Sequence, residues 1–190
     1  MKIRTVDADR VLGEAVHLAF SAKPGGESTP SAFALSGLSA VVTKHRPRTV
    51  FDCRAGIGAM TRLLLDHPHP TDRIVALEGD EASLRGFAKN IPADPRVRLV
   101  TNMGDLLIAG HGLDLIICDK GIDDLLPFLG ISERTRFFFD SNREPERRAL
   151  STFLSSRNLR LDQRHYPRFG LRWLPRPRRV EGFWLARVAR

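Results

Sequence analysis

Apolar residues in the middle of the chain form short uninterrupted runs, and most runs are followed by a segment in which apolar residues recur at helical spacing. The runs read RTVFD, RIVALE, VRLVT, LDLIICD and RFFFD and lie between residues 48 and 140. Strands that are continuously apolar, rather than alternating, are typical of strands covered on both faces. The segments 58–66, 81–90 and 121–129 are predicted helices. Alternation of buried strands with helices predicts a parallel, doubly wound α/β sheet.

The two ends of the chain carry other patterns. Residues 7–20 are compatible with a helix, residues 23–30 (KPGGESTP) form a breaker-rich loop, and Ser31 is a candidate cap of a helix to about Lys44. Further on, EPERRALSTFLSS predicts a helix, and LRLDQRHY and GFWLARV predict two strands. No helix-sized segment separates these strands, so we expect a hairpin with a reversed last strand. The prediction is a mostly parallel seven-stranded sheet in one domain, with a helical segment 1–46, a core 47–142 and a C-terminal part 143–190.

Composition narrows the class of protein. Of the 190 residues 42% are hydrophobic, and no apolar run reaches the length of about eighteen residues that a membrane span needs. The first residues do not lead into the apolar core of a signal peptide, and the two cysteines, Cys53 and Cys118, lie inside apolar runs. We therefore expect a soluble, reduced, cytoplasmic protein. The net charge of +8 favours anionic partners, either nucleic acid or a small molecule.

The stretch VFDCRAGIG holds the first candidate binding site. Gly56 and Gly58 follow a buried strand, and ligands of open parallel sheets bind at the carboxyl ends of strands. Glycine has no Cβ, so it can adopt φ > 0 and leave bare main chain for a ligand at the N-terminus of the next helix. A nucleotide cofactor is the usual occupant. The dinucleotide fingerprint Gly-x-Gly-x-x-Gly is incomplete, because Thr61 stands where its third glycine belongs.

DCRAGIG resembles the first motif of the class I S-adenosylmethionine (SAM)-dependent methyltransferases, in its variant Asp-x-x-Ala-Gly-x-Gly. IVALEGDEASLRGFAKN resembles the second motif of this family, VRLVTNMGDLL the third and LDLIICDKG the fourth. The matches follow the order of the family, with family-like spacing, over residues 28–142. The resemblance implies a Rossmann-like fold, SAM as cofactor and methyl transfer as the activity.

The resemblance also implies roles for single residues. Glu78 would accept two hydrogen bonds from a ribose diol, and Asp52 would steady the glycine loop near the methionine end of the cofactor. Asp105 would receive the adenine amino group, with Met103 and Leu106 beside the ring. The cofactor-binding set implied in this way is Asp52, Arg54, Ala55, Gly56, Gly58, Glu78, Gly79, Gly104, Asp105 and Asp119.

Two features depart from the family pattern. Arg54 replaces the first glycine of the common motif and adds a cation, which either points away or pairs with the cofactor's carboxylate. CDKG and FFFDSN resemble the metal-dependent small-molecule O-methyltransferases, in which Asp119, Asp140 and Asn142 would be oxygen ligands of magnesium or calcium. Ser141 interrupts the Asp-Asn pair of that pattern, so we predict no metal site.

Arginines crowd the segment between the last two strands. Arg168, Arg172 and Trp173 are candidate substrate-binding residues, because guanidinium groups bind carboxylates and phosphates bidentately and aromatic rings offer stacking faces. We expect an anionic small-molecule acceptor, with RNA as the alternative, since no recognised RNA-binding module is present. The Asn/Asp-Pro-Pro-Tyr/Phe signature is missing after the fourth strand, which favours an oxygen over a base nitrogen as the methylated atom.

Methyl transfer is an in-line attack that depends mainly on alignment. Asp119, Lys120 and His165 are candidate bases for a hydroxyl acceptor, without a ranking among them. Two other hypotheses stay open, namely a catalytically inactive methyltransferase-like protein that binds RNA or assists assembly, and a nicotinamide oxidoreductase. The sequence does not predict an oligomeric state.

Overall fold

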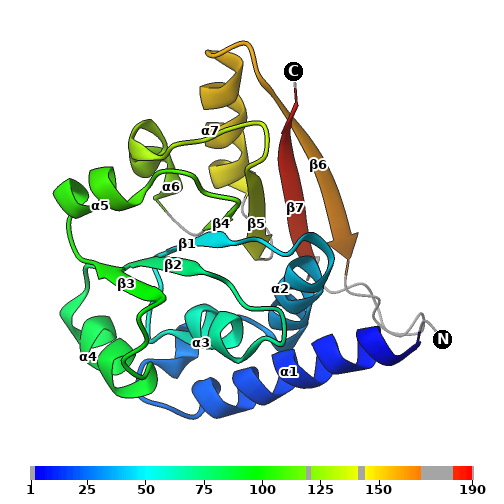
Figure 1. Ribbon diagram of the computed structural model, residues 1–190, viewed down its shortest axis with the longest axis vertical. Helices are drawn as coiled ribbons and strands as arrows, with labels where there is room; N and C mark the ends of the chain where they lie inside the picture. Colours follow the sequence, from blue (N-terminus) through cyan, green and yellow to red (C-terminus); the bar gives the residue numbers. More distant parts are fainter. Residues whose placement is uncertain (1–2, 119–120, 141–143, 168–181, 190) are drawn as a thin grey trace.

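The computed structural model describes residues 3–118, 121–140, 144–167 and 182–189 (Figure 1). These residues form a seven-stranded sheet with the strand order β3-β2-β1-β4-β5-β7-β6. Neighbours among β1 to β5 pair in parallel, whereas β7 is antiparallel to both β5 and β6. The predicted parallel sheet with a reversed last strand is confirmed. The strands are β1 (Thr49–Cys53), β2 (Arg73–Leu77), β3 (Val97–Val100), β4 (Leu115–Cys118), β5 (Arg136–Asp140), β6 (Arg160–Pro167) and β7 (Gly182–Ala189).

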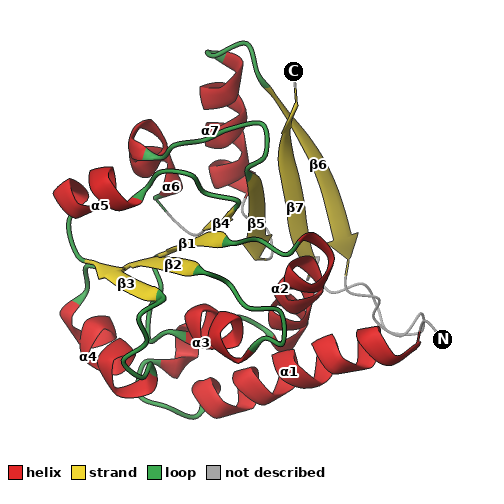
Figure 2. Cartoon of the chain, in the orientation of Figure 1, coloured by secondary structure: helices red, strands yellow, loops and turns green. Residues whose placement is uncertain are grey.

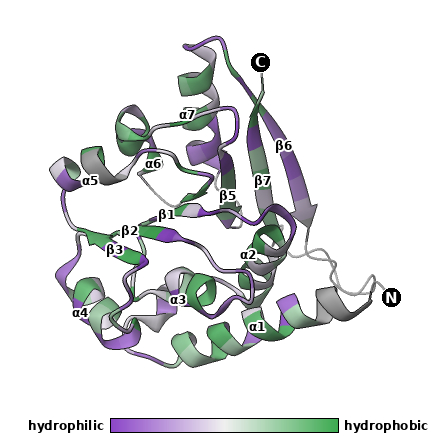
Figure 3. Cartoon of the chain, viewed as in Figure 1, coloured by the Kyte–Doolittle hydropathy of each residue, from purple (hydrophilic) through white to green (hydrophobic). Residues whose placement is uncertain are grey.

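Helices cover both faces of the sheet (Figures 1 and 2). One face carries α1 (Ile3–Ser21), α2 (Ala32–His45), α3 (Ala59–Asp66) and α4 (Glu81–Asn90), and the other α5 (Met103–Ala109), α6 (Ile122–Leu125) and α7 (Glu144–Ser155). Successive residues of β5 point to opposite faces of the sheet. Phe138 packs in the core under α1 to α4, whereas Phe137 and Phe139 pack in the core under α5 to α7. The central strands are therefore mostly apolar, and Figure 3 shows β5 mainly in green, whereas the edge strand β6 is largely purple.

Local signals place most helix boundaries. Ser31 caps α2, since its Oγ accepts the Ala34 amide at 3.1 Å, as expected. The helix predicted over 121–129 is shorter, because Pro127 has no N–H to continue it and the chain turns into a 3-10 helix, η2 (Leu126–Phe128). Helix α5 was not predicted, and strand β3 is an edge strand with exposed Arg98 and Leu99 rather than a fully covered one.

The described residues bear on two expectations from composition, which concern membrane spans and the two cysteines. None of their helices has both the length and the apolar character needed to cross a membrane. Cys53 and Cys118 lie in this part of the chain, are buried at 1% and 2% exposure, and form no disulfide.

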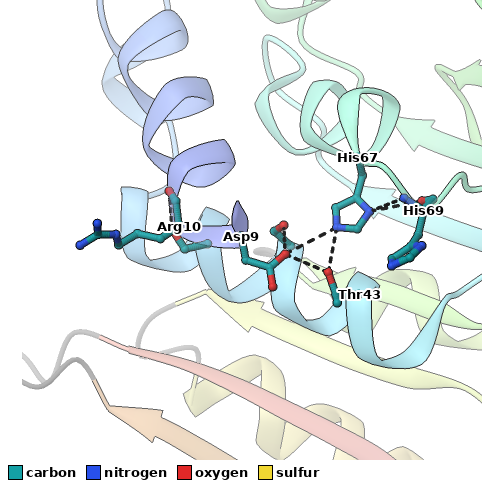
Figure 4. A network of polar contacts seen from close by, with 7 residues as sticks. Asp9, Arg10, Thr43, His67 and His69 are labelled. Atoms are coloured by element: carbon teal, nitrogen blue, oxygen red, sulfur yellow. Dashed lines mark hydrogen bonds and ion pairs between the residues drawn. The ribbon is translucent and has the colours of Figure 1, made fainter. Parts of the chain in front are cut away.

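A buried polar network joins α1, α2 and the end of α3 (Figure 4). The carboxylate of Asp9 accepts hydrogen bonds from Ser39 Oγ at 2.5 Å and from Thr43 Oγ1 at 2.9 Å. His67, which follows α3, accepts the His69 amide at Nδ1 (3.0 Å), so that its Nε2 carries the proton toward Thr43 Oγ1 at 3.3 Å. These contacts are satisfied by a neutral imidazole with its proton on Nε2, although the Asp9 carboxylate lies 3.7 Å from that nitrogen.

We expect the free energy of unfolding to fall as the pH drops below the ordinary histidine pKa of 6.5. Burial lowers the pKa of His67 in the folded chain and outweighs the opposite effects of the His69 backbone and of Asp9. The unfolded chain therefore takes up a proton at a higher pH than the folded chain does. Acid then favours unfolding by up to about 1.4 kcal/mol per pH unit for this group, which urea unfolding between about pH 5 and 7.5 can measure.

A His67→Gln variant separates this group from the rest of the protein. Burial also lowers the pKa values of His45 and His165, so only the difference between the wild-type and variant slopes reports on His67. We expect the variant to be less stable near neutral pH and to lose less stability on acidification. If the free energies of unfolding of the two proteins change with pH by the same amount, the role given to His67 is contradicted.

Candidate functional site

The glycine loop, residues 54–58, connects β1 to α3. Its backbone is fixed by two hydrogen bonds of 2.9 Å, from the Ala55 amide to the Leu77 carbonyl and from the Gly58 amide to the Ala55 carbonyl. Arg54, Gly56 and Gly58 all have positive φ angles, of 55°, 58° and 96°. The loop thus takes the left-handed turns that glycine adopts without strain, and it does so even at Arg54.

The two glycines of the loop have different surroundings. A Cβ on Gly58 would lie 2.6 Å from Ile91 Cγ1, so this glycine lets the start of α3 pack against the end of α4. A Cβ on Gly56 would meet no atom within 4 Å. Gly58 therefore serves packing, and Gly56 leaves an open stretch of main chain.

Glu78 directly follows β2 and is buried at 8% exposure. Its Oε2 accepts the Gly56 amide at 2.8 Å, and its Oε1 accepts the amides of Gly79 at 2.8 Å and Asp80 at 2.9 Å. A carboxylate offers about four acceptor positions, so three are occupied by the protein itself. Glu78 ties the glycine loop to the start of α4 and keeps about one acceptor position for a ligand, instead of the two expected for a ribose diol.

A cavity of about 710 Å³ lies at the carboxyl ends of β1, β4 and β5, against the glycine loop. The buried carboxylate of Asp52 lines it, and its Oδ2 accepts a hydrogen bond of 2.7 Å from Thr61 Oγ1. Asp140 at the end of β5 lines it as well. Other lining residues among those described come from the glycine loop (Arg54, Ala55, Gly56, Ile57), the strand ends (Cys53, Ile117, Cys118) and the chain segments 23–30 and 80–90.

Residues 23–30, predicted only as a loop, form one side of this cavity, which we call the wall. Lys23 Nζ donates to Asn90 Oδ1 at 2.7 Å, and Asn90 Nδ2 donates to the Ile57 carbonyl at 3.1 Å. Ile57 fits between two glycines, since a Cβ on Gly25 or on Gly86 would lie 3.0 Å or 2.6 Å from its Cγ2. The end of α4 thus fastens the wall to the glycine loop, and Gly25 and Gly86 are the signal in the sequence for this close packing.

Arg54 also lines the cavity, and its side chain is directed toward the start of α6. A Cβ on Gly121 would lie 2.9 Å from a guanidinium nitrogen of Arg54, so the guanidinium lies against the backbone just before that helix. Arg54 is exposed. Its cation therefore lies beside the cavity rather than filling it.

The residues predicted to bind the adenine, Met103, Asp105 and Leu106, are absent from the described lining of the cavity. Asp105 starts α5 together with Asn102, whose Oδ1 accepts the Asp105 amide at 3.0 Å and whose Nδ2 donates to Asp105 Oδ2 at 2.8 Å. Leu106 is fully buried in the core, so the expectation that it flanks the ring is wrong, whereas Met103 is exposed. Several predicted cofactor residues are absent from the described lining of the cavity, namely Gly58, Glu78, Gly79, Gly104 and Asp105.

His165 lies on the sheet face that α7 covers. Its ring stacks on Trp184 at 4.5 Å between centroids, and the Arg147 guanidinium lies 3.8 Å from the same Trp184 ring. Burial, followed by the charge of Arg147, lowers the pKa of His165. His165 is not among the described lining residues, which argues against it as the catalytic base.

The remaining predicted residues fall outside the described part of the chain. These are the candidate bases Asp119 and Lys120, the substrate residues Arg168, Arg172 and Trp173, and Asn142 of the alternative metal site. Within the described residues, no group of three or more His, Cys, Asp or Glu side chains could hold a metal ion.

No protein-family model and no curated protein matches the sequence. Solved structures do match it over nearly its whole length. They include an SAH-bound methyltransferase from Podospora anserina (TM-score 0.61, 17% identity, 100% of this chain and 97% of that chain) and an O-methyltransferase from Bacillus cereus in complex with SAH (0.59, 16%, 100% and 92%). A third is the O-methyltransferase TomG from Streptomyces achromogenes in complex with SAM (0.57, 15%, 95% and 89%). At these identities the likeness shows the fold, which is that of the Rossmann-like SAM-dependent methyltransferases.

Proposed function

We propose that this chain is a SAM-dependent methyltransferase that moves a methyl group to an oxygen, or to a nitrogen, of an anionic small-molecule acceptor. The observation that carries the proposal is the bare main chain at Gly56, which faces open space beside a cavity of about 710 Å³ at the carboxyl ends of the parallel strands. Ligands of open α/β sheets bind at this edge. Structures with this fold have been solved with SAH or SAM bound.

The residues around the loop fit such a cofactor. Gly56 leaves room that any Cβ would take, and Glu78, which is absent from the described cavity lining, holds the Gly56 amide in place from behind the loop. Asp52 contributes a buried carboxylate that lines the cavity. When bound, SAM would supply a methyl group on a positively charged sulfur.

The chain's own contribution is alignment and exclusion of water. The wall of residues 23–30, fastened through Asn90, closes one side of the cavity, and alignment of two reactants can lower a barrier by on the order of 7–11 kcal/mol. Asp119 and Lys120 remain candidate bases, and Asp140 adds a carboxylate from β5 that lines the same cavity.

Arg54 supports an anionic acceptor, because its exposed guanidinium lies at the cavity between the glycine loop and the start of α6. We expect Arg54→Gln to lower kcat/KM for hydroxylated carboxylates by about tenfold or more, the effect of losing one hydrogen bond to a charged group. The affinity for SAH should change by less than about threefold. Methyl transfer to a panel of carboxylated and neutral hydroxy compounds measures the first, and calorimetry the second.

An Arg62→Gln variant is the control for Arg54→Gln, since Arg62 pairs with Asp66 on α3 and is absent from the described cavity lining. It should behave as wild type in both measurements. A loss of SAH affinity in Arg54→Gln would instead assign this arginine to the cofactor's carboxylate. Equal activity on neutral and carboxylated compounds in both variants would contradict an anionic acceptor.

Calorimetry with SAM and SAH tests the proposed function as a whole. We expect one molecule of either ligand to bind per chain. No binding at millimolar cofactor would remove the enzymatic proposal and favour a methyltransferase-like protein that binds RNA or assists assembly. Cofactor binding together with methylation of RNA, but of no small acceptor, would place the acceptor among nucleic acids.

A further inference from the structure

A second cavity of about 400 Å³ lies at the opposite edge of the sheet. We call it the amino-end cavity, because its lining comes from the end of α2, the link to β1, and the chain at the starts of β4 and β5. In parallel strands the amino ends share one edge and the carboxyl ends the other. The length of β1, five residues or roughly 15 Å, separates this cavity from the glycine loop.

Basic side chains dominate the amino-end cavity. Its described lining residues include His45, Arg46, Arg48, Arg134 and Arg136, against two acids, Asp114 and Glu133. Asp114 is engaged by the protein itself, since its Oδ2 accepts the Arg48 and Thr49 amides at 2.9 Å and 3.0 Å. With four arginines against two acids, the described lining has an excess of positive charge.

Three of these arginines have no carboxylate partner in the described part of the chain. Arg48 Nε forms an ion pair of 2.6 Å with Asp72, but no ion pair joins Arg46, Arg134 or Arg136 to a described acid. Arg136 donates instead to the Arg134 carbonyl at 3.3 Å. Their guanidinium groups thus keep most of their donors for a ligand.

The pKa of the His45 imidazole is sensitive to the electrostatic potential inside this cavity. Burial lowers the pKa of His45, and the nearby charges of Arg136 and Lys44 lower it further. An anion bound among the arginines would oppose this effect and raise the pKa of His45.

We propose that the amino-end cavity binds a phosphate group, as a second site independent of the proposed methyl transfer. Guanidinium groups hold phosphate through paired N–H donors, and the cavity leaves room for a phosphate ester beyond the phosphate itself. The phosphate belongs either to a small phosphorylated compound or to an RNA backbone, and both present the same group to the arginines.

Two probes and a double variant of the full chain test this proposal. Pyrophosphate binding is measured by calorimetry and binding of a ten-nucleotide single-stranded RNA by fluorescence anisotropy, and the NMR shift of the His45 ring is followed with both probes. Arg46→Gln/Arg134→Gln should weaken binding of at least one probe by about tenfold per arginine removed. Arg10→Gln/Arg98→Gln removes the same charge from exposed positions absent from the described cavity lining and should change binding by less than about threefold.

The pattern of losses identifies the source of the phosphate. A loss confined to pyrophosphate supports a small phosphorylated ligand, and a loss confined to RNA, with a steep salt dependence, supports a nucleic-acid backbone. Retained SAH affinity in the double variant keeps the result separate from the proposed methyl transfer. The proposal is overturned if both double variants bind both probes equally, or if pyrophosphate and RNA leave the His45 signal unchanged.

Discussion

Replacing Glu78 by glutamine is expected to weaken SAH binding by about tenfold to a hundredfold and to lower the free energy of unfolding by about 1.5–3 kcal/mol. The carboxylate accepts the amides of Gly56, Gly79 and Asp80. Glutamine has only one oxygen, so its amide group must face at least one of these N–H donors, and a lost bond to a charged group has a cost of this size. Because Gly56 belongs to the loop that lines the cavity, binding and stability should fall together.

Glu81→Gln is the matched control for Glu78→Gln. It removes the same charge three residues further on, where the side chain is 88% exposed and forms an i,i+4 pair with Arg85. Exposed pairs of this kind contribute about 0.3–0.5 kcal/mol and an acid in the first turn of a helix about 0.3–1 kcal/mol, so stability should change by no more than about 1.5 kcal/mol and SAH affinity should stay as in wild type. Urea unfolding and calorimetry measure both variants. A Glu78→Gln protein that loses stability but binds SAH normally would limit Glu78 to a structural role.

The sheet could be predicted because its central strands are buried on both faces and leave an unbroken apolar signal. Phe137, Phe138 and Phe139 are all fully buried, although they face different helical layers. An edge strand weakens this signal, as the exposed Arg98 and Leu99 of β3 show. Helix α5 is only seven residues long and follows β3 almost directly, so no separate helical pattern stood out.

The candidate site could be predicted at the level of its loop but not of every side chain. The sequence shows that Glu78 ends a strand, but it cannot show that the fold brings three amides to its carboxylate. A cap and an adenine ligand look alike in a single sequence, so the pairing of Asp105 with Asn102 was not foreseen. His165 lies in β6, the edge strand beyond β7, where its ring stacks on Trp184, and the sequence could not show that the order of strands separates it from the cavity.

The wall of residues 23–30 shows a second limit of prediction from the sequence, which concerns long-range contacts. Lys23 and Asn90 are 67 positions apart, and although Gly25 and Gly86 allow close packing nearby, no local pattern pairs Lys23 with Asn90. Chain topology brings them together because α1, α3 and α4 pack on the same face of the sheet. Long-range contacts of this kind decide the shape of a cavity, whereas local patterns decide where its loop begins.

Gly58→Ala is expected to destabilise the protein by about 2–5 kcal/mol. A left-handed conformation costs an alanine about 1–2 kcal/mol, and the φ of 96° at Gly58 leaves no relaxed alternative. The new Cβ would also lie 2.6 Å and 2.8 Å from Ile91 Cγ1 and Cδ1, and overpacking of a core typically costs about 1–3 kcal/mol. Urea unfolding measures the sum. A double-mutant cycle with Ile91→Ala isolates the steric part, because shortening Ile91 should make Gly58→Ala less harmful.

Gly56→Ala is the contrasting variant two positions away, and it tests what the loop makes room for. Its φ of 58° carries the same backbone cost of about 1–2 kcal/mol, but its Cβ would meet no protein atom within 4 Å. The protein should therefore fold, while the added methyl group takes space beside the cavity and weakens SAH binding by about tenfold or more, as expected where a ligand lies directly on main chain. Normal SAH affinity in Gly56→Ala would mean that the bare main chain at residue 56 is not a binding surface, and the proposed cofactor site would then be wrong.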